Sequence, residues 1–311
     1  MTNLEKVTLL FNDAKKTNEF AAELFETFAT LIRALPKDQR DSLAEEIYTW
    51  ALLNKENQPK NLSFAFFLTG IIAFHDERYD DALRIITNVQ STFKDEGDLD
   101  AVASASVILG AIYRTLGEVE LALKFLLEAF EQLRSSNFWQ YLFGICCYNL
   151  AELYTETKHY DEALKMHNIN VENEGRSANN LIMALTYTGI ASIYQHQKKY
   201  DLALQYLNKA LSNAKATDSL LNVARVLTDI GNFYIETGDY TKALQYQNEA
   251  LDIRLNVHHS GGVVTNLIQI GEVYCHENKE DMAIEILGKA LATAEDIKVK
   301  PKIFSNTFNA L

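Results

Sequence analysis

The chain has 311 residues, a formal net charge of −13 and 48% hydrophobic residues. This hydrophobic content is enough to build a buried core, so it argues against an intrinsically disordered protein. The negative charge repels phosphate backbones, so we expect no direct binding of nucleic acid, whereas basic or hydrophobic partners are compatible with it.

The cysteines and the lack of a signal peptide predict that the chain resides in a reducing compartment. The cysteines Cys146, Cys147 and Cys275 are odd in number and two are adjacent, which argues against a disulfide framework and for a reducing environment. The N-terminus lacks the basic end, apolar run and cleavage site of a signal peptide. No apolar run reaches membrane-spanning length. We therefore expect a cytoplasmic chain that does not bind a membrane.

Residues 1–60 are predicted to form an N-terminal helical capping bundle. Apolar residues follow a period close to 3.6 up to Ile32, which predicts either one long helix or two. Pro36 ends this stretch, a further helix is predicted from about 37 to 53, and 54–61 is interpreted as a linker. Terminal segments of a repeat array are often atypical because they seal its end. A separate effector-binding bundle is the alternative.

A repeated pattern occupies residues 61–303. A small residue recurs at steps of 40 or 41, an aromatic residue usually follows three positions later, and an alanine always follows twelve positions later. No proline falls between Pro59 and Pro301, as a nearly all-helical region requires. The small residues are Gly70, Gly110, Ala151, Ala191, Gly231 and Gly271, and the alanines are Ala82, Ala122, Ala163, Ala203, Ala243 and Ala283.

Each repeat is predicted to be a pair of antiparallel helices. A small residue at the crossing lets the two helices approach closely, and the aromatic ring fills the space beside it. Turn residues such as Gly117-Glu118 and Gly238-Asp239 stop the first helix and start the second. Because one pair alone cannot bury its apolar face, the pairs must stack. The predicted fold class is all-α.

These recurring spacings resemble those of the tetratricopeptide repeat (TPR) family. The region departs from the family in its period of 40 residues, compared with about 34, and it lacks the family's proline near the repeat end. It is similar to the 40-residue arrays of spindle-orientation adaptors, bacterial Rap-type regulators and bacterial signalling proteins. The resemblance implies a right-handed superhelical solenoid of antiparallel helix pairs with an N-terminal helical cap.

Residues 304–311 are interpreted as the start of a truncated seventh repeat. Leu311 lies forty residues after Gly271, and the segment from Phe304 onward is apolar. An array that stops there has no polar cap. Our hypothesis is that the parent protein continues into further repeats and an output domain.

No motif indicates catalysis, a cofactor or a metal. The sequence has no phosphate-binding glycine loop, no GxSxG and no HExxH. His258, His259, Cys275 and His276 form two adjacent pairs instead of the spaced ligands that zinc requires. We therefore expect no enzymatic activity, no cofactor and no metal site.

The resemblance also implies where a partner binds. In the family, the first helix of each repeat lines a concave groove, and its ligand-facing positions lie three before the small residue and one, four and five after it. Asn149 and Asp229 lie two before the small residue, where family members often hold a peptide backbone. Arg225 lies six before it and adds a positive charge. Amide, hydroxyl and acidic side chains at such positions suit an extended or helical peptide. The predicted partner-binding residues are Tyr148, Asn149, Glu152, Thr188, Ser192, Gln195, Arg225, Thr228, Asp229, Asn232, Glu236, Ile268 and Glu272.

The predicted function is a non-catalytic protein- or peptide-binding scaffold, the sensory or docking region of a larger bacterial-type signalling protein. A partner with some basic residues is predicted by four acidic residues, Glu152, Glu156, Glu236 and Glu272. Two alternatives stay open. One is a self-associating assembly module, and the other is a regulatory domain of an attached kinase, cyclase or DNA-binding output domain. The sequence identifies neither the partner nor the oligomeric state.

Overall fold

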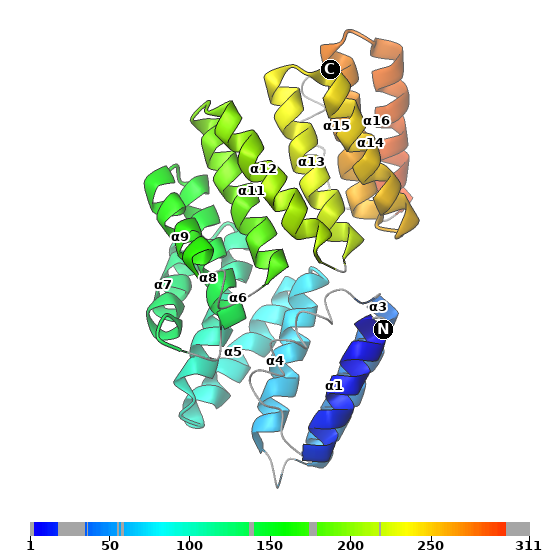
Figure 1. Cartoon of the computed structure of the whole chain (residues 1–311). Coiled ribbons are helices and arrows are strands. Elements are labelled where there is room, and N and C mark those ends of the chain that lie inside the picture. Colours follow the sequence, from blue (N-terminus) through cyan, green and yellow to red (C-terminus); the bar gives the residue numbers. More distant parts are fainter. Residues whose placement is uncertain are drawn as a thin grey trace. The chain divides into compact units, whose positions relative to one another are not determined.

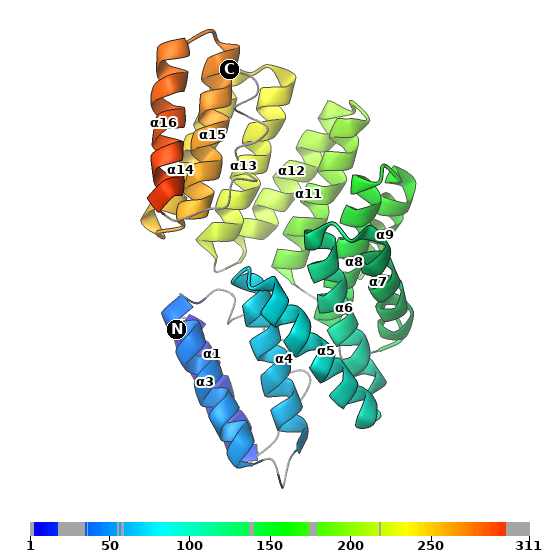
Figure 2. The same ribbon diagram turned by 180° about the vertical axis from the view of Figure 1, so that it is seen from behind.

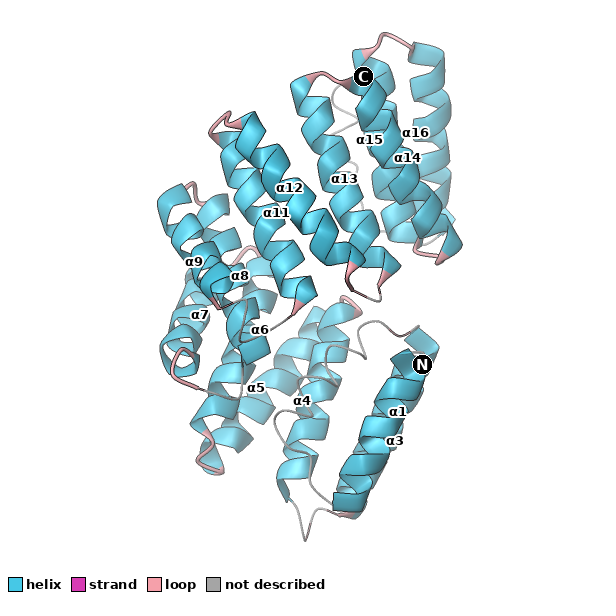
Figure 3. Ribbon diagram, viewed as in Figure 1, coloured by secondary structure: helices cyan, strands magenta, loops and turns pink. Residues whose placement is uncertain are grey.

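The computed structural model describes residues 3–17, 35, 37–54, 56, 59–136, 140–173, 179–217 and 219–296. All fourteen elements within these ranges are α-helices, as Figure 3 shows. The second half of the first predicted helix and the predicted seventh repeat at 304–311 lie outside the described residues. The prediction of an all-α fold is confirmed.

The helices divide between two compact units, residues 1–178 and 179–311, which we call unit 1 and unit 2. Unit 1 contains α1 (Asn3–Thr17), α3 (Lys37–Leu53), α4 (Pro59–His75), α5 (Tyr79–Asp95), α6 (Leu99–Leu116), α7 (Val119–Leu133), α8 (Gln140–Glu156) and α9 (Tyr160–Glu172). Unit 2 contains α11 (Asn180–His196), α12 (Tyr200–Lys215), α13 (Leu220–Thr237), α14 (Tyr240–Asn256), α15 (Ser260–His276) and α16 (Glu280–Asp296).

Consecutive helices pack as antiparallel pairs within each unit, which can be followed in Figures 1 and 2. The pairs are α4–α5, α6–α7 and α8–α9 in unit 1, and α11–α12, α13–α14 and α15–α16 in unit 2. Inside each unit, the second helix of one pair also packs on the first helix of the next. Each pair is therefore one repeat, and we number the repeats 1 to 6 in chain order.

The small residue of each repeat lies where its two helices cross. A Cβ added to Gly110 would lie 2.5 Å from Leu126 Cγ, and one added to Gly271 would lie 2.6 Å from Leu287 Cδ2. Carbon atoms do not approach this closely without displacement, so glycine allows the two helices to pack at this distance. The two alanines at the same position are fully buried.

The turn inside every repeat uses a left-handed backbone conformation. The residue seven positions after the small one has a φ between 57° and 81° in all six repeats. The next N–H then donates to a carbonyl in the preceding helix, as from Asp239 N to Tyr234 O at 3.0 Å. This is the hydrogen bond of a Schellman motif. The six left-handed residues are Glu77, Gly117, Lys158, Lys198, Gly238 and Asn278.

The two N-terminal helices extend unit 1 beside repeat 1. Phe11 of α1 meets Trp50 of α3 edge-on, with ring centroids 5.6 Å apart, and Tyr48 of α3 meets Phe66 of α4 at 5.2 Å. Helix α3 occupies the range predicted for it. Helix α4 starts at Pro59, inside the predicted linker 54–61, because proline fits the first turn of a helix, where its missing N–H leaves no bond unmade.

Helix α6 is long and apolar enough to span a membrane by length and composition, contrary to the expectation from the sequence. However, 61% of it is buried in unit 1, where it packs against α5, α7 and α8. A helix that is apolar on most of its faces is expected at the centre of a stack of repeats. Its position between neighbouring helices therefore accounts for its composition.

Candidate functional site

The first helices of neighbouring repeats form one layer in each unit. In unit 2, α13 contacts both α11 and α15, and in unit 1, α6 contacts both α4 and α8. Among the described residues, the second helices of neighbouring repeats make no comparable contact. The first helices are therefore the closely spaced side of each stack. We call the surface of the first helices that faces away from the second helices the inner face. The opposite surface, formed by the second helices, is the outer face.

Helix α13 carries a stripe of polar side chains on the inner face of unit 2. Arg225, Asp229, Asn232 and Glu236 are separated by four, three and four residues, which places them on one side of an α-helix. Arg225 and Glu236 are exposed, and Asp229 and Asn232 are half-buried. All four were predicted to bind a partner, and the structure places them together. We call them the α13 stripe.

The same spacing on α15 adds two residues that the sequence prediction missed. Thr265 and Gln269 lie forty residues after Arg225 and Asp229 and are half-buried, and they continue in line to the predicted Glu272. Their hydroxyl and amide groups add donors and acceptors to the inner face. The signal was present in the sequence, because the four-three-four spacing of the α13 stripe recurs one repeat later.

Side chains from neighbouring repeats meet along the inner face of unit 2. Gln195 of α11 donates from Nε2 to Glu236 Oε2 at 2.9 Å, and the Tyr200 hydroxyl donates to Glu236 Oε1 at 3.3 Å. Desolvation and the nearby negative charge of Glu236 raise the pKa of Tyr200. Ser192, one turn before Gln195, is half-buried. These contacts connect the predicted residues of α11 to the α13 stripe.

Four predicted residues are less accessible than expected, and one of them is Asn149 of α8, which is 4% exposed. Thr228 and Ile268 are each 6% exposed, and the Thr188 hydroxyl oxygen is buried although the residue as a whole is half-buried. Ile268 packs in an apolar cluster that includes Val264 and Ala290. Thr228 and Ile268 contact neighbouring helices, so direct contact with a ligand falls to more exposed residues.

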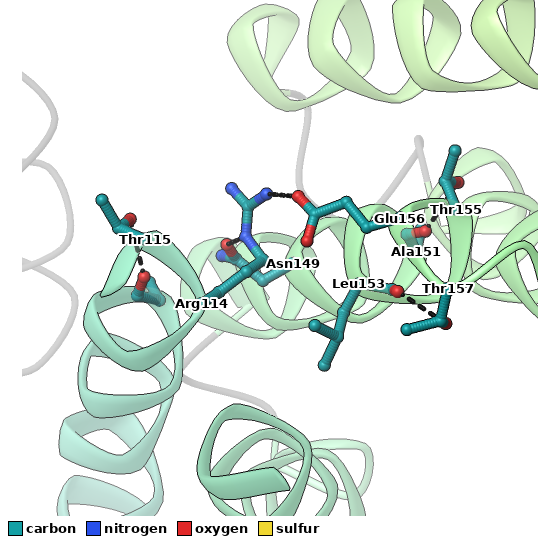
Figure 4. A network of polar contacts seen from close by, with 9 residues as sticks. Arg114, Thr115, Asn149, Ala151, Leu153, Thr155, Glu156 and Thr157 are labelled. Atoms are coloured by element: carbon teal, nitrogen blue, oxygen red, sulfur yellow. Dashed lines mark hydrogen bonds and ion pairs between the residues drawn. The ribbon is translucent and has the colours of Figure 1, made fainter. Parts of the chain in front are cut away.

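In unit 1, an arginine of α6 forms hydrogen bonds with polar side chains of α8. Arg114 of α6 donates from Nε to Asn149 Oδ1 at 3.2 Å and from Nη1 to Glu156 Oε1 at 2.8 Å (Figure 4). Asn149 also donates to the carbonyl four residues earlier in its helix, at 2.9 Å. Tyr148 and Glu152 on the same helix are half-buried. Both polar groups of the Asn149 amide are therefore engaged within the protein.

A buried polar cluster lies beneath the α13 stripe and consists of Thr228, Gln247, Arg254 and Asn266. Gln247 Nε2 donates to Thr228 O at 3.2 Å and to Asn232 Oδ1 at 2.9 Å. Asn266 Nδ2 donates to Gln247 Oε1 at 2.6 Å and to Thr228 Oγ1 at 3.1 Å. Arg254 Nη1 donates to Asn266 Oδ1 at 2.6 Å. The cluster thus connects α13, α14 and α15.

Burial and charge act on the arginine of this cluster in opposite directions. Burial is the larger effect and lowers the pKa of Arg254, whereas the carboxylate of Asp229 in the α13 stripe raises it. Arg254 also donates to Gly262 O at 2.9 Å, so the guanidinium is held by α15 as well. The sequence prediction missed this cluster, although polar residues at 247 and 266 were visible where most other repeats have apolar ones.

The histidines considered as zinc ligands have other contacts. His259 accepts a hydrogen bond from Gly262 N through Nδ1 at 3.0 Å, at the start of α15. The ring of His276 stacks on Tyr240, with centroids 5.4 Å apart. Within the described ranges, no group of three or more His, Cys, Asp or Glu side chains could hold a metal ion.

Comparison with known sequences identifies the repeats. A family model described as tetratricopeptide repeat matches residues 145–216, 182–256 and 222–296. No enzyme family is detected. A search of curated protein sequences finds no match. The matched ranges cover repeats 3 to 6.

Solved structures share the fold at low sequence identity. A Rap protein complexed with Competence and Sporulation Factor is 18% identical, with 94% of this chain and 77% of that chain covered and a TM-score of 0.67. NprR in complex with its cognate peptide NprX is 18% identical, with 97% and 89% covered and a TM-score of 0.62. BtubC (BKLC) from P. vanneervenii is 18% identical, with 72% and 91% covered and a TM-score of 0.56.

The sequence match and the helix pairs agree with each other. The matched ranges contain the small residues and invariant alanines of repeats 3 to 6. The structure arranges them as sequential antiparallel pairs, as in the Rap and NprR structures with which it aligns. The chain is therefore a tetratricopeptide-repeat protein.

Proposed function

We propose that the chain is a non-catalytic scaffold that binds a peptide, or an extended segment of a protein, on the inner face of unit 2. The observation that carries this proposal is the α13 stripe, continued on α15 by Thr265, Gln269 and Glu272. Amides, hydroxyls and carboxylates on one accessible face can satisfy the donors and acceptors of a peptide backbone. NprR, which shares this fold, was solved in complex with its cognate peptide NprX.

The charges of this face suit a partner that carries basic residues. Asp229, Glu236 and Glu272 are acidic, and Arg225 is the basic member of the α13 stripe. Opposite charges steer a partner and fix its register on the surface. The net charge of −13 supports the same preference. We further propose a cytoplasmic location and a sensory or docking role within a larger signalling protein, on the strength of the resemblance to bacterial regulators.

Selection of peptides on the purified chain tests this function. We expect a random peptide library to yield binders enriched in Lys and Arg, and Asn232→Ala to weaken their affinity about tenfold, measured by calorimetry. Truncation of a central contact that forms a hydrogen bond has an effect of this size. Circular dichroism establishes that the variant keeps its helices.

Asn208→Ala is the matched control. Asn208 is exposed on α12, on the outer face of the same unit, so its replacement should leave peptide affinity unchanged. Equal affinities of the wild type and Asn232→Ala would show that the α13 stripe is not the site. Light scattering of the ligand-free chain over a concentration series distinguishes a peptide scaffold from a self-associating module, because the second requires oligomers without a ligand.

A further inference from the structure

Gln247 occupies a position that is apolar in most repeats. The residue sixteen positions after the small residue packs against it at the helix crossing, as Leu126 does at Gly110. The six residues at this position are Ile86, Leu126, His167, Leu207, Gln247 and Leu287. Gln247 is fully buried, so its amide required partners that an apolar residue would not need. The buried polar cluster and Asn232 are those partners.

The hydrogen bonds of the cluster have a fixed direction. A guanidinium can only donate, so the atom of Asn266 that lies 2.6 Å from Arg254 Nη1 must be the carbonyl oxygen Oδ1. The Asn266 amine therefore points at Gln247, and the atom of Gln247 that receives its hydrogen bond must be Oε1. Arg254 thus determines the orientation of the first two amides.

A second group determines the same orientation independently. The backbone carbonyl of Thr228 can only accept, and Gln247 approaches it at 3.2 Å, so the Gln247 atom there must be the amine Nε2. That amine also contacts Asn232 at 2.9 Å, where it requires an acceptor. Asn232 must therefore turn its Oδ1 toward the buried cluster.

The orientation of Asn232 decides what the inner face offers. Its amide is planar, with Oδ1 and Nδ2 on different edges, so binding Oδ1 inward leaves Nδ2 on the accessible side. Within the part of the chain that the structure describes, Asn232 Nδ2 donates to no other group. Glu236 lies one turn away on the same helix and is acidic. This negative charge favours a neutral acceptor oxygen over a carboxylate opposite Nδ2.

We propose that Gln247, held by Asn266 and Arg254, is a positioning residue that makes Asn232 present a hydrogen-bond donor on the inner face of unit 2, to an amide carbonyl oxygen of the bound partner. The proposal deepens the proposed function and rests on it for the identity of the partner. The orientation of Asn232, however, is a property of the ligand-free chain. It can therefore be tested whether or not a peptide is found.

Hydrogen exchange of side-chain amides in the full chain tests the orientation. In ¹⁵N-labelled protein, the NH₂ signals of Gln247, Asn266 and Asn232 are assigned by the single variants Gln247→Met, Asn266→Asp and Asn232→Asp. We expect slow exchange for Gln247 and Asn266, whose amines are buried and bonded, and rapid exchange for Asn232. Slow exchange of the Asn232 amine, or rapid exchange at Gln247, would overturn the proposal.

The affinity of a peptide from the library selection tests the positioning role. Gln247→Met keeps the volume of the buried side chain but removes the amide that orients Asn232. We therefore expect the affinity for the peptide to fall about fivefold. The matched control is Leu207→Met, at the same position of repeat 4, which should leave affinity unchanged. If Gln247→Met also leaves affinity unchanged, its role is only structural. If no peptide is recovered, the proposed function fails, and the exchange pattern still decides the orientation.

Discussion

At the turn inside each repeat, the left-handed residue is glycine in repeats 2 and 5 and lysine, glutamate or asparagine in the others. A side chain in this conformation brings its Cβ close to the following carbonyl oxygen, which costs about 1–2 kcal/mol, whereas glycine does not incur this cost. The Schellman hydrogen bond forms in all six turns, including that from Lys199 N to Tyr194 O at 2.8 Å. The rest of the turn therefore holds the unfavourable residues in place.

Lys198→Gly should stabilise unit 2 by about 1 kcal/mol. Lys198 has a φ of 59° and is exposed, so the substitution relieves backbone strain and removes no buried contact. Urea denaturation followed by circular dichroism measures the change. Gly238→Ala is the reverse experiment in the neighbouring repeat and should destabilise by a similar amount. This account would be contradicted if Lys198→Gly did not stabilise the protein and Gly238→Ala did not destabilise it.

Only part of these turns could be predicted from the residues. Gly117 and Gly238 indicated them, because glycine favours the left-handed region. Lys158 and Lys198 carry no such signal, since lysine rarely adopts a positive φ. Their conformation follows from their place in the repeat, which only the alignment of all six copies reveals.

Between the helices of a repeat, the small residue and the residue sixteen positions later form a matched pair. Where the small residue is glycine, the residue sixteen positions later lies so close that a methyl group on the glycine would overlap with it. Leu126 lies this close to Gly110. In repeat 4, by contrast, Ala191 and Leu207 are both buried together. The crossing therefore accommodates a methyl group in repeat 4 but not in the repeats with glycine.

Gly110→Ala should destabilise unit 1 by about 1 kcal/mol. The overlap with Leu126 outweighs the gain of about 1 kcal/mol that alanine brings to a helix interior. In a chain that already carries Leu126→Ala, the overlap is gone, so the same substitution should become stabilising. A double-mutant cycle based on urea denaturation measures this coupling. Additive effects of the two substitutions would show that the pair does not set the helix separation.

The inner face shows where the element-level prediction was incomplete. The small residues predicted the helix pairs because close approach of two helices leaves few alternatives at a crossing. The family's ligand positions, however, included Thr228 and Ile268, which are buried. The accessible side of α13 follows the four-three-four spacing through Asp229 and Asn232, which lie about 100° and about 40° of helix rotation from Thr228. Such a rotation depends on how the neighbouring helices pack, which the repeat spacing does not encode.

For the molecule as a whole, one buried histidine makes folding sensitive to acid. His167 of α9 is fully buried, and neither of its ring nitrogens has a hydrogen-bond partner among the described residues. Burial lowers the pKa of His167 to about 4, from 6.5. The folded chain therefore binds this proton less readily than the unfolded chain. The free energy of unfolding is therefore unaffected by this histidine above pH 6.5. It decreases as the pH falls from 6.5 toward 4, because the unfolded chain binds the proton first.

His167→Leu should reduce the acid sensitivity of unfolding. Between pH 7.5 and pH 4.5, the wild type should lose about 2–3 kcal/mol more than the variant, as calculated from the two pKa values. Leucine suits this site because repeat 4 buries Leu207 in the equivalent position beside an alanine. The measurement is the urea midpoint of both proteins across this pH range. Parallel pH profiles would exclude His167 as the source.

The sequence predicted the kind of architecture, because periodic small, aromatic and alanine residues dictate helix pairs. It did not predict the buried polar cluster. Gln247 and Asn266 are nineteen residues apart, and nothing in their spacing shows that α14 brings them together between α13 and α15. Contacts of this kind depend on three helices at once, whereas the repeat pattern specifies two at a time.

The same cluster has a consequence for how unit 2 assembles. Repeats of nearly equal length carry interchangeable crossing sites, so a second helix could dock on the wrong first helix and leave the array slipped by one repeat. Gln247 is satisfied only when α14 meets both Asn232 and Asn266. If α14 packed on α11 instead of α13, Gln247 would lie against Ala191 and its buried amide would lack these partners. The loss would destabilise the slipped arrangement by about 1–3 kcal/mol. The cluster therefore distinguishes the native order of helices from an out-of-register one.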